Sequence, residues 1–201
     1  MKKKVIMGGI IVVIILGAIG YSVVKSNRDK EANNIKVEQQ KQTESLNKND
    51  ISKSINGLSD QELMKKYLLL KDSKVPVKDR SEASEVARKF AKAITEYNSN
   101  NPKEGEKEAL SCVSKDIYND VQGMFITKGK DKDSDIKEKN ILRIRSEERV
   151  NSEDNGYIYI KVTPIYTVID KHNQKRDDST SYVIQLLKVN GEYKVTSFRV
   201  I

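Results

Sequence analysis

A run of twenty uncharged residues, Val5 to Val24, constrains this chain more than any other feature. Twelve of the twenty are Ile, Leu or Val, and each favours a bilayer by about 0.3 to 0.6 kcal/mol in a helix. A helix of that length rises about 30 Å, which matches the hydrocarbon thickness of a bilayer. The sequence therefore predicts a transmembrane helix over residues 5–24 and a polar domain on one side of the membrane.

Basic residues beside this run predict its orientation. Residues 2–4 are all lysine, and basic residues next to a span tend to stay cytoplasmic. Lys25, Arg28 and Lys30 follow the run and weaken the bias. We expect residues 1–4 to form a cytoplasmic head in a single-pass protein of the cell membrane whose C-terminal domain is extracytoplasmic.

A cleaved signal peptide is the alternative reading of the same residues. Residues 2–4 would be its basic region, residues 5–16 its apolar region and residues 18–20 its cleavage site. The apolar run continues past that site to Val24, which favours a retained anchor. A lipoprotein anchor is excluded because the region has no cysteine.

The composition of the chain limits which partners it can bind. Charged residues make up 33% of the sequence, Trp is absent and the formal net charge is +8. Positive charges alternate with acids, as in residues 103–108, and no stripe of arginines and aromatic residues is present. We expect no direct contact with nucleic acid, and attribute the basic balance to solubility beside a membrane surface.

Cys112 is the only cysteine, so an intramolecular disulfide is excluded. Its neighbours are apolar, which predicts a buried thiol. An exported domain without disulfides is typical of Gram-positive bacteria, and the Lys-, Asn- and Ile-rich composition agrees with that origin.

Residues 25–58 contain no aromatic residue and no Pro, so they cannot bury enough surface to offset their ordering entropy. We predict a polar stalk or linker there. Ser59 and Glu62 then form a capping box that begins a short helix, and Pro76 breaks the segment. Residues 59–80 are interpreted as this short helix and a connector, docked on the domain that follows.

From Ser81 the apolar residues recur at steps of three and four, which predicts the longest helix of the polar domain. They are Ala83, Val86, Ala87, Phe90, Ala91, Ile94 and Tyr97. Two shorter helices are predicted around residues 104–110 and 114–125, the second with Ser114 as its N-cap. The charged segment 128–140 is expected to be an exposed loop.

After Ile141 the apolar period changes to two, which predicts strands. Four are expected, at residues 141–149, 157–169, 179–189 and 192–201. The predicted irregularities are hairpin turns at Asn155-Gly156 and Asn190-Gly191, an edge or bulge at Pro164, and a bulge near Thr196-Ser197. Helices followed by such a meander predict an α+β domain, with the helices packed on a curved four-stranded antiparallel sheet.

This order of elements resembles the nuclear-transport-factor-two-like cone fold over residues 81–201. The ending Gly191-Glu192-Tyr193-Lys194-Val195 is similar to the frequent last hairpin of that superfamily, Gly-x-aromatic-Lys-aliphatic. A head, one span, a stalk and such a domain together resemble the VirB-eight-like subunits of type IV secretion systems, including divergent versions in Gram-positive conjugative elements. The resemblance implies a non-catalytic assembly subunit of a conjugative transfer channel, with the membrane, other channel subunits and copies of itself as partners.

No residue pattern predicts an enzyme. The only histidine, His172, lies in a polar segment that is predicted to be a hairpin loop. We expect a solvated side chain there rather than a general base. Asp131, Asp133 and Asp135 alternate as in a calcium loop, but lysines intervene and the Gly and Glu of such a loop are missing. We predict no catalytic, cofactor-binding or metal-binding residue and no cofactor.

Two other functions remain open. One is an extracytoplasmic module whose cone pocket binds a small molecule or a peptide, and the other is a generic cell-surface protein of the same fold. The sequence alone identifies no partner-binding residue and no oligomeric state.

Overall fold

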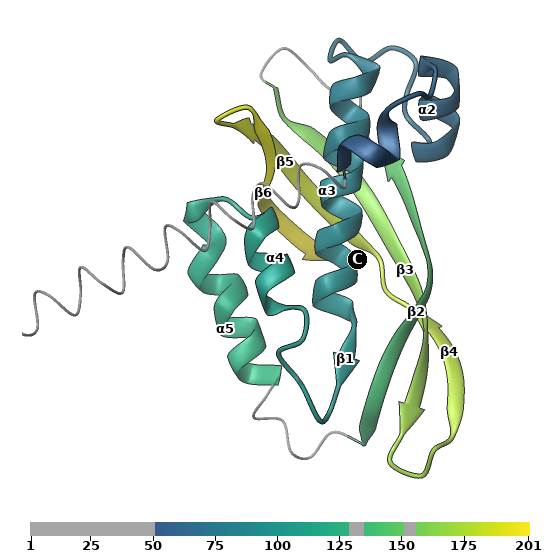
Figure 1. Ribbon diagram of the computed structural model, residues 1–201, viewed down its shortest axis with the longest axis vertical. Helices are drawn as coiled ribbons and strands as arrows, with labels where there is room; N and C mark the ends of the chain where they lie inside the picture. Colours follow the sequence, from purple (N-terminus) through teal and green to yellow (C-terminus); the bar gives the residue numbers. More distant parts are fainter. Residues whose placement is uncertain (1–50, 129–134, 151–155) are drawn as a thin grey trace, which may run out of the picture. The chain divides into compact units, whose positions relative to one another are not determined.

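The computed structural model describes residues 51–128, 135–150 and 156–201, which all lie in the unit Leu46–Ile201 (Figure 1). Its helices are α2 (Asp60–Tyr67), α3 (Val77–Thr95), α4 (Glu106–Cys112), the 3-10 helix η1 (Lys115–Ile117) and α5 (Tyr118–Lys128). Its strands are β1 (Tyr97–Asn98), β2 (Ile136–Glu148), β3 (Ile158–Asp170), β4 (Lys175–Ser179), β5 (Tyr182–Val189) and β6 (Glu192–Val200).

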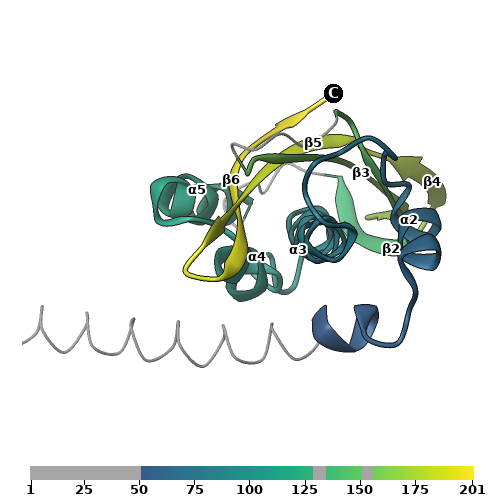
Figure 2. The same cartoon turned by 90° about the horizontal axis from the view of Figure 1, so that it is seen from above.

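The strands form one antiparallel sheet in the order β1-β2-β3-β5-β6, with β4 also paired to β3. Figure 2 shows α3 end-on within the curve of this sheet, with α4 and α5 on one side of it and α2 on the other. The predicted α+β class and the curved sheet are confirmed. The predicted number of four strands is wrong, because the described residues form a sheet of six.

The two additional strands are β1, which has only two residues, and β4. The strand residues that the sequence assigned to polar loops, in β2 and in β4, are largely charged. β2 begins at Ile136, so residues 136–140 are strand rather than loop, and they pair with both β1 and β3. β4 has the sequence Lys-Arg-Asp-Asp-Ser, and its side chains are almost all exposed. A strand that water reaches on both faces has no apolar alternation, so the period of two cannot reveal it.

Pro164 lies in β3, an interior strand, so the edge alternative for this residue is wrong. The strands beside it are irregular on both sides. On one side of β3, the strand β2 carries an extra residue at Leu142. On the other side, the strand paired with β3 changes from β4 to β5 between Ser179 and Tyr182. Pro has no N–H to donate, so this break in the ladder accommodates it.

The last hairpin agrees with its prediction. Asn190 and Gly191 have φ angles of 52° and 83°, as a type I′ turn requires. The register shifts so that Thr196 is left between the pairs Gln185–Ser197 and Leu186–Val195, which confirms the bulge. Of the other expected turn, Gly156 has a positive φ of 76°, and Asn155 lies outside the described residues.

The long helix α3 begins at Val77, four residues before the predicted start, with Pro76 as its N-cap. Pro has a fixed φ that suits a helix entrance, so Pro76 begins α3 as well as ending the connector. The capping box of α2 is confirmed: Ser59 N donates to Glu62 Oε2 at 2.8 Å, and Glu62 N donates to Ser59 Oγ. Ser114 is the N-cap of η1, but its hydroxyl makes no capping bond.

Residues 51–55 are helical, and Ile55 is only 3% exposed, packed with residues of α2 and the connector. This differs from a stalk that continues to Leu58. Residues 25–50 of the expected stalk, the head 1–4 and the span 5–24 lie outside the described residues. In the part that the structure describes, no helix has both the length and the apolarity needed to cross a membrane.

The core lies between α3 and the concave face of the sheet. Ala83, Ala87 and Ala91 let α3 approach closely, and Phe90 meets the ring of Phe198 edge-on at 4.9 Å between centroids. The inward residues predicted for β3 are all buried: Ile158, Ile160, Val162, Tyr166 and Val168. Cys112 is buried as well, which confirms its prediction.

Candidate functional site

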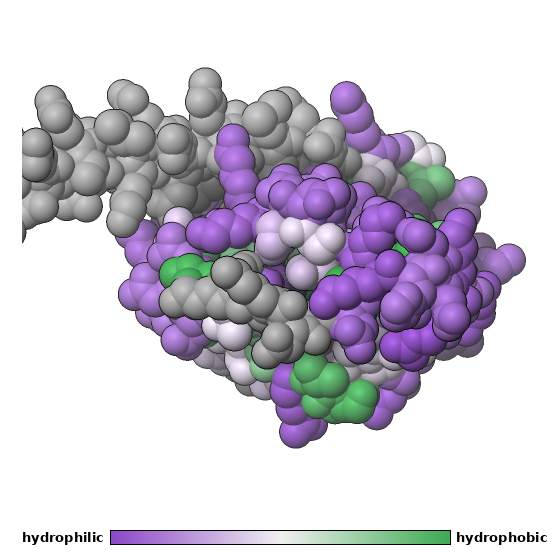
Figure 3. Space-filling view, turned by 90° about the horizontal axis from the view of Figure 1, so that it is seen from below, coloured by the Kyte–Doolittle hydropathy of each residue, from purple (hydrophilic) through white to green (hydrophobic). Residues whose placement is uncertain are grey.

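A pocket with a volume of about 210 Å³ lies where α3 and α5 end beside the sheet. Figure 3 views the molecule from this end. The lining residues come from two helices, from four different strands or their ends, and from one loop: Ile94, Thr95, Tyr97, Lys128, Ile136, Lys139, Tyr166, Thr180 and Tyr182. Two lysines and three tyrosines give it a cationic and aromatic character.

Lys128, the last residue of α5, points to the C-terminal end of α3. Its Nζ donates hydrogen bonds to the backbone carbonyls of Ile94 and of Glu96, the latter at 3.4 Å. These carbonyls have no partner within the helix, so the ammonium caps α3. Burial, together with the nearby charge of Lys139, lowers the pKa of Lys128 to about 8.

Lys139 enters the pocket from β2. Its Nζ lies 5.6 Å from the centroid of the Tyr166 ring, a distance at which a cation and an aromatic face attract each other. The Tyr166 hydroxyl lies 2.8 Å from Thr180 Oγ1. Two cations and an aromatic wall therefore face the same space.

Tyr182 forms the inner wall of the pocket and is fixed by a second pair of hydroxyls. Its hydroxyl lies 3.0 Å from Thr95 Oγ1, and burial raises the pKa of Tyr182. The phenol therefore stays neutral near pH 7 and adds no negative charge to balance the lysines.

The lining suits the binding of an anion better than proton transfer. None of the lining residues is a carboxylate, an imidazole or a thiol. A lysine whose pKa is lowered can also act as a nucleophile. The Lys128 ammonium, however, is held by two carbonyls, and no base lies among the lining residues beside it.

A second polar arrangement lies near the other end of α3. Arg80 and Glu148 form a buried ion pair at 2.6 Å between Nη1 and Oε2. This pair binds the connector between α2 and α3 to the end of β2, so we assign it a structural role. The sequence prediction missed it because Arg80 precedes the periodic segment from Ser81.

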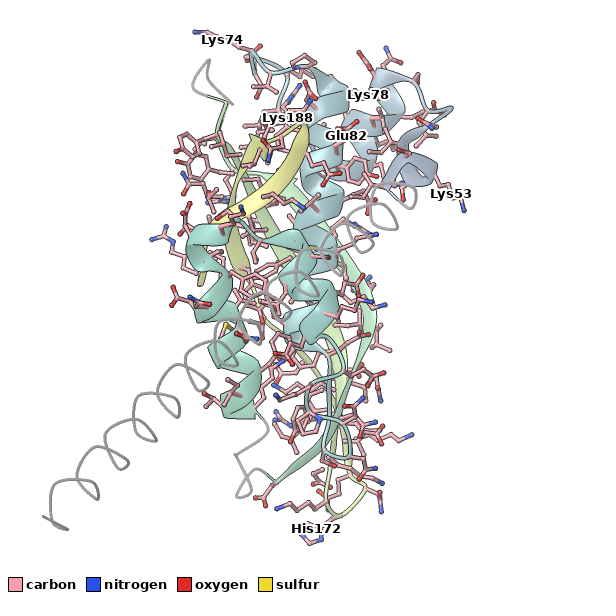
Figure 4. The ribbon with its side chains drawn as sticks, turned by 60° about the vertical axis from the view of Figure 1, so that its left-hand side comes forward. Lys53, Lys74, Lys78, Glu82, His172 and Lys188 are labelled. Atoms are coloured by element: carbon pink, nitrogen blue, oxygen red, sulfur yellow. The ribbon has the colours of Figure 1, made fainter. Side chains whose placement is uncertain are left out.

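The side chains considered as candidates in the sequence do not form a site. His172 is exposed at the β3–β4 turn, where its backbone N donates to Asp170 Oδ1 at 2.8 Å, and Figure 4 places it far from Glu82 and Lys188. Asp135 is exposed, and residues 131 and 133 lie outside the described ranges. No group of three or more potential metal ligands occurs among the described residues.

Lys128 and Lys139 were not predicted as site residues. Both lie in the segment 128–140 that the sequence assigns to an exposed loop. Charge by itself does not distinguish them from the other lysines of that segment. Only the pairing of β2 with β1 and β3 brings Lys139 opposite the end of α5.

No protein-family model matches the chain, and no curated protein matches its sequence. Among solved structures, CagV, a VirB8 homolog of the type IV secretion system of Helicobacter pylori strain 26695, is 15% identical with a TM-score of 0.41, over 60% of this chain and 96% of CagV. Agrobacterium tumefaciens VirB8 is 12% identical with a TM-score of 0.40, over 61% of this chain and 92% of that chain. The intermembrane space region of the chloroplast protein ARC6 is 11% identical with a TM-score of 0.40, over 59% and 93%.

Two of these three structures are VirB8 proteins, the family that the sequence resembles. At such identities and TM-scores these likenesses assign no role to this chain.

Proposed function

We propose that this chain is a non-catalytic, membrane-anchored assembly subunit of a type IV secretion channel for conjugative transfer. The observation that carries the proposal is the order of its segments. A predicted span at residues 5–24 and a predicted stalk precede an α+β domain of helices followed by a curved antiparallel meander. That order is the one on which the VirB-eight-like resemblance rests.

The anchor has a physical purpose in this proposal. A span holds the domain at the membrane surface, and the stalk sets how far it reaches. Confinement to a surface raises the effective concentration of each domain for its neighbours, so weak interfaces suffice for assembly. Contacts with other channel subunits and self-association are therefore the proposed interactions, without direct binding of nucleic acid.

An extracytoplasmic location in a Gram-positive host is part of the same proposal. Cys112 is buried, and burial raises the pKa of its thiol to about 11, which disfavours the reactive thiolate. Such a cysteine stays reduced in an oxidising compartment without forming a disulfide. This agrees with an exported domain that needs no disulfide for stability.

The location is tested by protease treatment of intact protoplasts that produce the full chain with a C-terminal tag. We expect loss of the tag and retention of the N-terminal segment in the membrane fraction. Recovery from the medium of a protein that begins at Tyr21 would instead establish a cleaved signal peptide.

The function is tested by deletion of the gene in a donor that is proficient in conjugation. We expect the transfer frequency to fall and to be restored by the full chain, but not by a chain without residues 1–24. Full activity of that shortened chain, or unchanged transfer after deletion, would refute the proposal.

A matched control addresses catalysis. The variant His172→Ala removes the only imidazole of the chain from an exposed turn, so it should leave the fold intact. It should restore transfer as well as the unaltered chain does. Loss of transfer by a folded His172→Ala protein would argue for a chemical role.

A binding module is the second candidate, and the pocket beside Lys128 and Lys139 favours it. The two candidates differ in their genetic surroundings. A neighbouring gene for a conjugation ATPase or a relaxase supports the secretion channel, whereas its absence from all occurrences of this gene supports the binding module.

A further inference from the structure

We propose that the pocket at the C-terminal end of α3 binds a carboxylate attached to a compact apolar or aromatic group. Lys128 and Lys139 hold the carboxylate, and the rings of Tyr97 and Tyr166 contact the apolar part. This site goes beyond an assembly role and does not depend on it. The carboxylate belongs either to a free small acid or to the C-terminal residue of a peptide.

Uncompensated charge is the first argument. Among the described residues, neither Lys128 nor Lys139 forms an ion pair. Elsewhere in the domain many lysines lie beside carboxylates, as Lys188 does with Asp79 at 2.7 Å. Two partly enclosed cations that have no counter-ion among the described residues attract an anion more strongly than exposed lysines do, because water screens them less.

The count of hydrogen-bond donors is the second argument. An ammonium has three N–H donors, and Lys128 uses two of them, one in a long contact of 3.4 Å with the Glu96 carbonyl. Lys139 contacts a ring face and donates to no protein oxygen among the described residues. Donors are therefore left for the two oxygens of a carboxylate.

Size and shape are the third argument. The volume of about 210 Å³ exceeds the roughly 150 Å³ of a buried cavity known to hold a benzene ring. The lining combines tyrosine rings with Ile94 and Ile136, so it offers apolar contacts as well as charge. A bare inorganic anion would leave these surfaces uncovered, whereas an aromatic acid would cover them.

A purely structural role is the competing explanation for Lys128, since it caps α3. That role does not explain Lys139, whose side chain donates to no backbone carbonyl among the described residues, or the pocket that both lysines line. It also predicts no preference for a charged ligand over a neutral one of the same shape.

The test measures ligand binding to the full chain in phosphatidylcholine nanodiscs by saturation-transfer NMR, with empty nanodiscs as the blank. The probes are benzoate and benzamide, which share a ring but differ in charge. We expect saturable binding of benzoate and at least about tenfold weaker binding of benzamide, because a charged hydrogen bond is lost. Equal binding of the two, or no saturable benzoate binding, would overturn the proposal.

Three variants assign the binding to the pocket. Lys139→Met and Lys128→Met each remove one cation and should weaken benzoate binding by about tenfold. Lys107→Met removes the same charge from an exposed position of α4 and should change nothing. Because Lys128 also caps α3, Lys139→Met is decisive if the other variant fails to fold. Equal weakening by Lys107→Met would overturn the assignment.

A second pair of probes separates the two sources of the carboxylate. N-acetyl-Ala-Phe with a free C-terminus and the same dipeptide with an amide end differ only in charge. Tighter binding of the free acid than of benzoate supports a peptide terminus as the ligand. Benzoate binding without any binding of the dipeptide acid supports a small acid.

The pH profile of benzoate binding to the unaltered protein gives a further readout. Lys139, Tyr97, Tyr166 and Tyr182 line the same pocket from the sheet, and the carbonyls of Ile94 and Glu96 accept from the Lys128 ammonium. Loss of the Lys128 proton above about pH 8 should weaken benzoate binding. The same weakening in Lys128→Met would contradict this assignment.

Discussion

Arg80 of α3 and Glu148, the last residue of β2, form an ion pair in which the side chains are 2% and 0% exposed. Their contacts extend to the connector between α2 and α3. Glu148 Oε2 also accepts from Leu70 N at 2.9 Å, and Glu148 Oε1 accepts from Ser73 Oγ. Arg80 Nε donates to the Val75 carbonyl at 2.8 Å. One buried pair therefore joins the connector, the helix and the sheet.

We expect Arg80→Met to lower the free energy of unfolding by about 3–5 kcal/mol, because Glu148 would remain buried without its cation. Urea unfolding of a fragment that begins at Leu46 measures the change. Arg149→Met is the control, since it breaks an exposed pair with Glu147 and should cost about 1 kcal/mol or less. Equal costs for the two variants would show that burial of the pair is unimportant.

Gly105 and Gly123 give a second matched pair. A Cβ at Gly105 would lie 2.2 Å from the Ala93 carbonyl oxygen of α3, so Gly105→Ala should push α4 away and cost about 1–3 kcal/mol. A Cβ at Gly123, within α5, meets nothing within 4 Å, so Gly123→Ala should stabilise by about 0.5–1 kcal/mol. Thermal melting monitored by circular dichroism distinguishes the two signs.

Lys128 makes stability depend on pH. Its pKa is about 8 in the folded protein and 10.5 in its ordinary state, so the unfolded chain binds more protons between these values. The contribution of Lys128 to the free energy of unfolding therefore rises with pH across that window. We expect Lys128→Met to lack this rise, measured as the difference from the unaltered protein between about pH 7 and 10. A constant difference would contradict the lowered pKa.

Truncation tests where the folded domain begins. The sequence predicts that a fragment from Leu58 folds as an α+β domain. Ile55 is buried, and Lys66 Nζ donates to the Ser54 carbonyl at 2.9 Å, so we expect this fragment to be less stable than one from Leu46 by about 1.5–3 kcal/mol. Circular dichroism melts compare the two. A coil spectrum from the shorter fragment, or equal midpoints, would contradict this expectation.

Phe90→Asp tests the core. Phe90 is fully buried on the sheet side of α3, and an unpaired carboxylate there should prevent cooperative folding. Lys92→Asp places the same acid on the exposed side of the helix and should cost about 1 kcal/mol or less. Near-ultraviolet circular dichroism and thermal melting measure both variants. Retained cooperative melting in Phe90→Asp would mean that the packing around α3 is misassigned.

The sequence predicted those helices, strands and turns whose residues form a recognisable pattern within a short stretch of chain. The alanine-rich face of α3, the capping box at Ser59 and the Asn190-Gly191 turn depend on residues within one or two turns of chain, so periodicity and turn chemistry reveal them. The apolar alternation of β3 likewise predicts its buried face. For the same reason the α+β class follows from the order of such segments.

The charged strands, the buried ion pair and the pocket depend on the tertiary structure alone. β4 and the first residues of β2 are strands because β3 supplies their hydrogen-bond partners, although their charged side chains carry no apolar pattern. Arg80 and Glu148 are 68 residues apart, and the pocket gathers residues from Ile94 to Tyr182. Contacts over such separations depend on how the sheet curves around α3. No window of sequence contains both partners, and therefore the composition and spacing of the chain could not predict them.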